Sequence, residues 1–440
     1  LDGGTRSTAT LTGATIATRS LGLLMLGGAV TFDGGTIAGG NPATEGALGA
    51  DITGGTAVFA GTALSGGSRF TGIQLGGSGQ VTLRANSAGP TRVTTTLPAT
   101  ASDASDGVVI AAGASGASLL IDGGTDISKF DSGLVVNDGS LFIQGAGVTI
   151  KENRGNGIEL LGRVGGVVVT LSSGTVRDNA RTGIVMRSTV PSTIQNLTIS
   201  GNGGDGFDAQ RTQTAAQIGY RLVFAGNSIV SNGGRGIALT GKGTGAGSGT
   251  LLGGKVGVRL ERNTVTNNAG VGIYVTESVD APDGDDVTEV SMDTNDVGGN
   301  LTAAATAPVE ILAGGVFFAR SDLTTRIVLG SFLGNRVHGN GRHEIGFDVA
   351  QDGGAAWNLS SNASGVDMAT GCAATAKPNT ITCYDTVMGQ DLAIAVASPG
   401  IPVNVQGMHF QNANPIAGRD YSLAIPAAQI AVACTPQACP

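Results

Sequence analysis

A nine-residue pattern that recurs along the middle of the chain limits the folds this sequence can adopt. Each copy contains a β-branched residue, two variable residues, Asn, three variable residues, Gly and then a large apolar residue. From Gly157 to Gly183, Gly206, Gly236 and Gly272 the successive spacings are 26, 23, 30 and 36 residues. This uneven spacing disfavours helical-pair repeats and indicates a fixed core with loops of variable length. The five full copies are Ile150–Ile158, Val176–Ile184, Ile199–Phe207, Ile229–Ile237 and Val265–Ile273.

Hydrophobic alternation after each Gly predicts a strand. The large apolar residue and the residue two positions later are both apolar or small, and this period of two places them on one side of a strand. Parallel stacking of the copies about 4.8 Å apart would build a continuous apolar column. A sixth copy, Val337–Ile345, has Glu344 in place of the Gly, and Val297–Asn300 is a degenerate copy. The inward pairs are Ile158 and Leu160, Ile184 and Met186, Phe207 and Ala209, Ile237 and Leu239, Ile273 and Val275, and Ile345 and Phe347.

The Asn of each copy is expected in a turn between two short strands. There its amide can bond the turn backbone and the equivalent Asn of the next coil, which forms a ladder. The Gly is expected either to adopt a positive φ or to lie in close contact with its neighbour. Because every copy carries the Asn whatever its loops contain, we assign it a structural role. The predicted turn positions are Asn153, Asn179, Asn202, Asn232, Asn268 and Asn340.

These copies resemble the parallel β-helix repeat of the pectin-lyase-like superfamily, whose members form a right-handed solenoid of three sheets. The resemblance implies an all-β fold with a single solenoid over residues 1–356, and its clearest coils span residues 150–347. Upstream, Gly107 and Gly133 continue the register of the later glycines. Residues 357–440 are expected to form a C-terminal cap, in an arrangement similar to the ends of bacterial cell-surface β-helix proteins.

Composition and charge exclude several other classes. The chain has 75 Gly among 440 residues, and Gly weakens a helix interior by about 1 kcal/mol relative to Ala, so a helical protein is excluded. A net charge of −8 without a basic cluster argues against nucleic acid as a partner. The most apolar window, Leu21–Val30, is about half the length of a membrane span. Because the chain begins at Leu1 without Met, we expect a processed N-terminus of an exported protein.

All four cysteines lie near the C-terminus in two local pairs. We expect two small-loop disulfides, Cys372–Cys383 and Cys434–Cys439, and therefore an oxidising compartment. A zinc site is the alternative, but only His409 lies near in sequence and neither spacing is a Cys-x-x-Cys knuckle. Together with export, the pairs predict an extracellular or cell-surface location.

The sequence lacks the motifs of known enzymes with this repeat. It has neither the Asn-Thr-Asp, Asp-Asp and Gly-His-Gly set of pectin hydrolases nor the Asp-Pro-His of alginate epimerases. The histidines, His338, His343 and His409, have no nucleophile at a recognised spacing and are expected to be exposed structural residues. One charged cluster can bind a uronate carboxylate through its arginines, although a surface ion-pair cluster is the alternative. Its members are Asp205, Asp208, Arg187, Arg211 and Arg235.

A second candidate is an acidic stretch with Gly and Pro. Its carboxylates are of the kind that Ca²⁺ accepts, but their spacing matches no established calcium loop. A solvated acidic loop is the preferred interpretation, and no other cofactor is expected. The four acids are Asp280, Asp283, Asp285 and Asp286.

Taken together, these features favour a secreted or surface-displayed structural protein, such as a fibre or coat subunit or an adhesive stalk, without catalytic activity. Aromatic residues make up only 4 % of the chain, which leaves few platforms for sugar rings. The alternative is a polysaccharide lyase or epimerase that acts on acidic glycans near Asp208. The expected partners are a second copy, docked end to end because Leu1–Thr5 offers nothing to blunt an open edge, and a cell-surface or extracellular glycan.

Peptide mapping of the non-reduced chain tests the cysteine pairing. We expect Cys372 linked to Cys383 and Cys434 linked to Cys439, because local pairs close the smallest loops. A Cys372–Cys434 link, or four thiols, would contradict both the pairing and the oxidising compartment.

Overall fold

The computed structural model describes residues 7–39, 47–67, 69–95, 105–161, 169–187, 192–212, 221–243, 255–279, 287–301, 313–320, 327–349, 357–359, 379–382, 394–397, 401, 403–404 and 409–410. Within these residues every regular element is a β-strand, and no helix is long and apolar enough to span a membrane. The chain divides into two compact units, Leu1–Gly204 and Asp205–Pro440.

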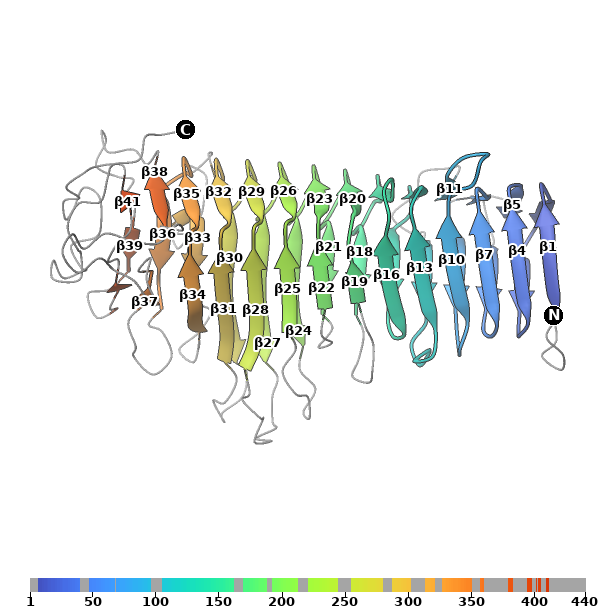
Figure 1. Cartoon of the computed structure of the whole chain (residues 1–440), viewed down its shortest axis with the longest axis horizontal. Helices are drawn as coiled ribbons and strands as arrows, with labels where there is room; N and C mark the ends of the chain where they lie inside the picture. The colour runs from blue at the N-terminus through green and yellow to red at the C-terminus, as the bar shows by residue number, and fades with distance from the viewer. Residues whose placement is uncertain are drawn as a thin grey trace. The chain divides into compact units, whose positions relative to one another are not determined.

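The first unit winds through three parallel sheets, A, B and C, and visits each sheet once per coil (Figure 1). Sheet A contains β1 (Thr8–Thr12), β4 (Ala29–Asp33), β7 (Thr56–Ala60), β10 (Gln80–Arg84), β13 (Ser118–Asp122), β16 (Ser140–Gln144), β19 (Val169–Leu171) and β22 (Ser192–Gln195). Sheet B contains β2 (Thr15–Thr18), β5 (Thr36–Gly39), β8 (Ala63–Gly66), β11 (Thr91–Thr95), β14 (Thr125–Ser128), β17 (Thr149–Lys151), β20 (Gly174–Arg177) and β23 (Leu197–Ser200). Sheet C contains β3 (Leu21–Met25), β6 (Ala47–Ile52), β9 (Phe70–Leu75), β12 (Asp106–Ile110), β15 (Ser132–Val136), β18 (Ile158–Leu160) and β21 (Ile184–Met186).

The second unit repeats this three-sheet arrangement. Its sheet A strands are β25 (Arg221–Ala225), β28 (Lys255–Glu261), β31 (Val287–Asp293) and β34 (Ile327–Leu333). Its sheet B strands are β26 (Ser228–Val230), β29 (Thr264–Thr266), β32 (Asp296–Gly298), β35 (Arg336–His338), β38 (Thr380–Thr382) and β41 (His409–Phe410). Its sheet C strands are β24 (Phe207–Thr212), β27 (Ile237–Gly243), β30 (Ile273–Val279), β33 (Ala313–Phe318), β36 (His343–Phe347) and β39 (Ile394–Val396), and a separate pair joins β37 (Trp357–Asn358) to β40 (Val403–Asn404).

The register of sheet C confirms the inward positions predicted from the alternation. In the first unit Leu134 lies opposite Ile158, which lies opposite Ile184, and in the second unit Ile237 lies opposite Ile273. All six predicted pairs are buried, with no side chain more than 3 % exposed. Since equivalent residues of successive coils stack, the all-β parallel β-helix expected from the repeat is confirmed.

The residue before each ladder Asn has a positive φ, in the left-handed region of backbone conformation. Glu152, Asp178, Ser231 and Asn267 have φ values of 55°, 55°, 56° and 56°. The Asn after each of them then hydrogen-bonds the neighbouring coil, so its side chain stabilises a turn between sheets B and C that the backbone alone disfavours.

The repeat glycines are required for close contact and not for a positive φ. None of Gly157, Gly206, Gly236 and Gly272 is among the positive-φ residues, which corrects that half of the expectation. A Cβ added at Gly157 would lie 2.6 Å from the carbonyl oxygen of Gly183 and 2.6 Å from Cγ1 of Val176. The same contact recurs from coil to coil within each unit, at Gly22, Gly49, Gly72, Gly107, Gly133, Gly206, Gly236, Gly272 and Gly315.

Parallel strand pairing continues beyond residue 356, where the sequence predicts the end of the solenoid and the start of the cap. Strand β38 pairs with β35 and then with β41, and β39 pairs with β36. Strands β38, β39 and β41 of the predicted cap region therefore extend sheets B and C, while β37 and β40 form a separate pair. Its cysteines lie outside the described residues, so the two disulfides stay predictions.

Substitution of Gly157 by Ala tests the close contact. We expect a loss of about 1–3 kcal/mol, because the added Cβ overlaps a carbonyl oxygen that the sheet holds in place. The matched control is Gly257→Ala, since a Cβ at Gly257 meets nothing within 4 Å. Urea denaturation measures both variants, and equal midpoints for the two would contradict the steric explanation.

Candidate functional site

Asp208 of the predicted charged cluster lies on the outer side of sheet C in the second unit and is only 5 % exposed. Its register partner on β27 is Ala238, whose small side chain covers little of the space above the strand. The hydroxyl of Thr240, two residues further along β27, donates a hydrogen bond to Oδ1 of Asp208 at 3.0 Å. The carboxylate is therefore held against the sheet and directed along it.

Arg235 is fully engaged by its neighbours in the cluster. Its Nε and Nη2 atoms lie 3.1 and 2.8 Å from Oδ2 of Asp205, and its backbone N–H donates to Oδ1 at 2.6 Å. Its guanidinium carbon lies 4.8 Å from the centre of the Tyr274 ring. Although burial opposes the charge, the hydrogen bond and charge of Asp205, with a smaller contribution from Asp208, raise the pKa of Arg235. The ion pair and the ring leave little of this guanidinium to bind a uronate.

Within the second unit the structure brings Asp205 and Asp208 close to Arg235. Asp205, Asp208 and Arg235 belong to the second unit, whereas Arg187 belongs to the first unit and is exposed. Arg211 lies on β24, and its side chain is outside the described residues. Arg235 forms an ion pair with Asp205 and lies over the ring of Tyr274.

Two aromatic side chains on the outer face of sheet C were not part of the predicted site. Phe317 lies opposite Tyr274 on the outer side of sheet C, and the ring centres are 5.8 Å apart in an edge-on arrangement. Phe317 is nevertheless only 2 % exposed and packs in a small apolar cluster with Val271, Ala313 and Ala319. Burial raises the pKa of Tyr274, and the charge of Asp348 adds to this effect while Arg235 opposes it. The outer face of sheet C is thus partly covered at these strands.

A group of carboxyls in the first unit is a second candidate that sequence analysis missed. Asp106, at the start of β12, lies opposite Ser132 of β15. Burial raises the pKa of Asp106 to about 6, and the charges of Asp131 and Glu159 add to the effect, while a hydrogen bond from the Ser132 backbone opposes it. The signal was the register of Gly107 with Gly133, which places Asp106 beside the coil that carries Asp131.

The neighbours of Asp106 are themselves bound. Asp131 accepts a hydrogen bond from Nη2 of Arg154 at 2.9 Å. Glu159 accepts hydrogen bonds from Ser132 at 2.7 Å and from Asn156 at 2.9 Å. These contacts make the group a polar cluster on the solenoid surface, with Asp106 as the carboxyl whose protonation is most altered by burial.

The predicted ladder asparagines are buried and hydrogen-bonded to one another within each unit. In the first unit Nδ2 of Asn153 donates to Asn179, and Asn179 donates to Asn202, both at 2.8 Å. In the second unit the series runs from Asn232 through Asn268 and Asn300 to Asn340, with each step at 2.9 Å. Glu344 then accepts hydrogen bonds from the backbone N–H and the Nδ2 of Asn340, so the residue that breaks the sequence pattern ends the ladder.

A second ladder at the corner between sheets A and B was not predicted. Asn227, Asn263, Asn295 and Asn335 each donate to the next Asn at 2.9 to 3.3 Å, and Asn379 is the last acceptor. In sequence, the first four lie five residues before the asparagines of the other ladder, and this spacing was the available signal. In the first unit the same corner holds Thr62, Thr91 and Thr125, which are fully buried.

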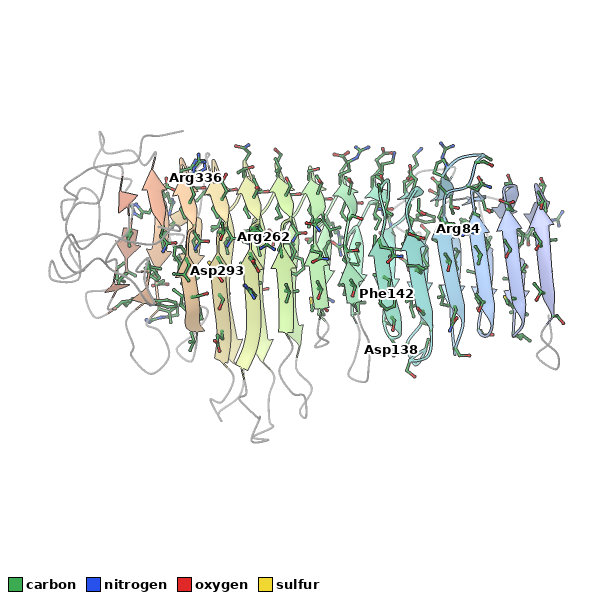
Figure 2. The ribbon with its side chains drawn as sticks, viewed as in Figure 1. Arg84, Asp138, Phe142, Arg262, Asp293 and Arg336 are labelled. Carbon is green, nitrogen blue, oxygen red and sulfur yellow. The ribbon has the colours of Figure 1, made fainter. Side chains whose placement is uncertain are left out.

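Among the histidines, His338 departs from the expected exposed position. Its side chain is 18 % exposed and its Nε2 lies 2.9 Å from Oδ1 of Asp296. This hydrogen bond lowers the pKa of Asp296, and Arg336, labelled in Figure 2, lies 3.9 Å from the same oxygen. The pairing arises because Gly298, which has no side chain, lies opposite His338 and leaves space for its ring.

The remaining predicted ligands lie outside the described residues. Asp280, Asp283, Asp285 and Asp286 fall in a segment that is not described, as do all four cysteines. Within the described part of the chain, no group of three or more His, Cys, Asp or Glu residues is arranged to hold a metal ion.

The family model of the right-handed β-helix region matches residues 106–297. Together with the three parallel sheets, this match supports a right-handed parallel β-helix fold. No curated protein matches it. Among solved structures it is similar to the crystal structure of the Dettilon tailspike protein (gp208), with 15 % identity and a TM-score of 0.42 over 89 % of this chain and 62 % of that chain. The chain thus spans less than two thirds of the length of that protein.

Replacement of Asp106 by Asn tests the origin of its shifted pKa. The folded pKa of about 6 exceeds the ordinary value of 3.8, so the fold favours the neutral carboxyl, and this contribution to stability is lost as pH rises through about 6. We expect Asp106→Asn to be more stable than the parent by about 1–3 kcal/mol at pH 7 and equal to it near pH 4. Chemical denaturation at both pH values is the measurement, and a variant less stable than the parent at pH 7 would contradict the assignment.

Proposed function

We propose that this right-handed parallel β-helix is a non-catalytic structural protein of the extracellular space or cell surface, and that it associates with a second copy through its first coil. The observation that carries the proposal is the exposure of apolar side chains on that coil, strands β1, β2 and β3. The two disulfides expected from the sequence support the location. A fibre or coat subunit and an adhesive stalk are the roles that fit such a protein.

Side chains that face the interior of the first coil remain partly exposed. Leu11, Ile16 and Leu23 are half-buried, whereas Phe32 and Ile37 in the next coil are fully buried and Val30 is 3 % exposed. A solenoid coil buries its inner side chains only when it has a neighbour on both sides. The first coil therefore presents an incomplete layer of the core.

The outer surface of the same coil is also apolar. Leu21, Leu24 and Leu26 are 36, 45 and 56 % exposed and are the large hydrophobic residues with the greatest exposure in the described chain. Arg19 is the one charged residue between positions 7 and 32. Charged residues on an edge strand commonly prevent pairing with another chain, and the first coil has almost no charged residues.

The unpaired strand edges lie on the same coil. Strands β1, β2 and β3 each pair on one side only among the described residues. A partner has to offer three strands at once, in the same triangular arrangement, to satisfy all three edges. The end of another solenoid coil meets this requirement, and a single extended peptide does not.

The charged cluster supports a structural role over the glycan lyase or epimerase proposed as the alternative. Arg235 is bound by Asp205 and stacked on Tyr274, so it is a poor ligand for a uronate. The buried carboxylate of Asp208 is the one observation that favours the alternative. Incubation with pectate, alginate and glycosaminoglycans, with and without Ca²⁺, should give no unsaturated product absorbance, and product formation would replace the structural proposal by the enzymatic one.

Sedimentation velocity of the full chain tests the association. We expect a concentration-dependent dimer at micromolar concentrations and a dissociation constant at least about tenfold higher for Leu24→Ser/Leu26→Ser, because the two side chains lose apolar contact area. The control is Leu120→Ser/Phe142→Ser, which removes apolar groups from the outer face of sheet A, away from the first coil. A parent that is monomeric at all concentrations, or equal weakening by both variants, would overturn the proposed interface.

A further inference from the structure

We infer that Asn202 and Asn340 are latent deamidation sites that the asparagine ladders hold inert, so that unfolding of a coil leaves a permanent covalent record. Both residues precede glycine, Gly203 and Gly341. Glycine has no side chain to hinder its backbone nitrogen, and Asn-Gly steps are for this reason the most reactive of asparagine sites in an unfolded chain.

The reaction is intramolecular until its last step. The backbone nitrogen of the glycine attacks Cγ of the asparagine and forms a new N–C bond, and its proton is lost to hydroxide or another base. The bond between Cγ and Nδ2 breaks, and the amide nitrogen leaves as ammonia after it is protonated. Water then opens the resulting succinimide to aspartate or isoaspartate.

The fold first engages the nucleophilic nitrogen in a hydrogen bond. The N–H of Gly203 donates to the carbonyl oxygen of Asn179, and that of Gly341 donates to the carbonyl oxygen of Asn300, both at 2.8 Å. The corresponding bond recurs in three other coils, from Ala180 to Asn153, from Ala269 to Asn232 and from Leu301 to Asn268. Each attacking nitrogen is therefore held by a hydrogen bond to the previous coil, which must break before the nitrogen can turn toward Cγ.

The ladder also fixes the amide that would be attacked. Oδ1 of Asn202 accepts hydrogen bonds from the backbone N–H and Nδ2 of Asn179 at 3.2 and 2.8 Å. Oδ1 of Asn340 accepts the corresponding bonds from Asn300 at 3.0 and 2.9 Å. With 1 and 6 % exposure, neither side chain can rotate onto its own backbone or meet hydroxide unless the coil opens.

The product of the reaction is incompatible with the ladder. At Asn340 the Nδ2 group donates to Oε2 of Glu344 at 2.5 Å, and Glu344 is fully buried. A carboxylate at position 340 would replace this donor by a second acceptor and place two buried carboxylates in contact. A chain that has deamidated while unfolded is therefore expected to be unable to rebuild this coil at neutral pH.

Peptide mapping by mass spectrometry tests the inference on the full chain. One sample is kept folded in mildly alkaline buffer and another is kept in the same buffer with guanidinium chloride. We expect deamidation at positions 202 and 340 to be slower in the folded sample by roughly a hundredfold or more, because it requires local opening. Asn179, which precedes Ala180, is the internal control and should lag behind both sites in the unfolded sample. Similar rates at position 340 in folded and unfolded samples would overturn the inference.

Two variants test the incompatibility of the product. Asn340→Asp reproduces the deamidated ladder, and Asn196→Asp makes the same change at an exposed turn residue. We expect Asn196→Asp to refold from guanidinium chloride at neutral pH as the parent does, and the refolded fraction of Asn340→Asp to fall severalfold. Equal refolding of both variants would show that a carboxylate is tolerated at position 340 and would contradict this part of the inference.

Discussion

The spacing between parallel strands determines what each coil of this molecule can contain. Successive coils are held at the distance of a backbone hydrogen bond on all three sheets, so every side chain lies directly against its counterpart in the next coil. At the start of sheet C this distance excludes even a Cβ atom, as the contact between Gly157 and the carbonyl of Gly183 shows. At the corners it suits a side chain that both donates and accepts, and asparagine meets this requirement in Asn268 and Asn300.

The repeat was visible in sequence because these two restrictions act at fixed positions of the same turn. Gly and Asn recur with a constant offset, and the apolar alternation after Gly157 then follows from the strand. The second ladder, from Asn227 to Asn379, escaped detection because its corner accepts other solutions, Thr62 and Thr91 among them. A position that accepts several residue types leaves a pattern in only part of a single sequence, here the five-residue spacing of asparagines in the second unit.

The site was harder to predict than the fold. Identification of Asp106 required the exact register of coils separated by long loops, and the burial of Phe317 on an outward position cannot follow from alternation within its strand. Arg235 and Asp205 were grouped as candidate site residues, and in the structure they form an ion pair. Whether the pair binds a ligand or only itself depends on distances that the sequence does not contain, and the short contacts with Asp205 favour the structural role. Among the described residues, Asp205, Asp208 and Arg235 form hydrogen bonds between neighbouring coils.

The direction of the ladders has an electrostatic consequence. From Asn232 to Asn340 every amide donates toward the C-terminal side and accepts from the N-terminal side, so the side-chain dipoles add head to tail as peptide dipoles do in an α-helix. The positive end of this column lies at Asn340, where the carboxyl of Glu344 accepts two of its N–H groups. Glu344 thus lies at the positive end of four aligned amides, as an acidic residue lies at the N-terminus of a helix.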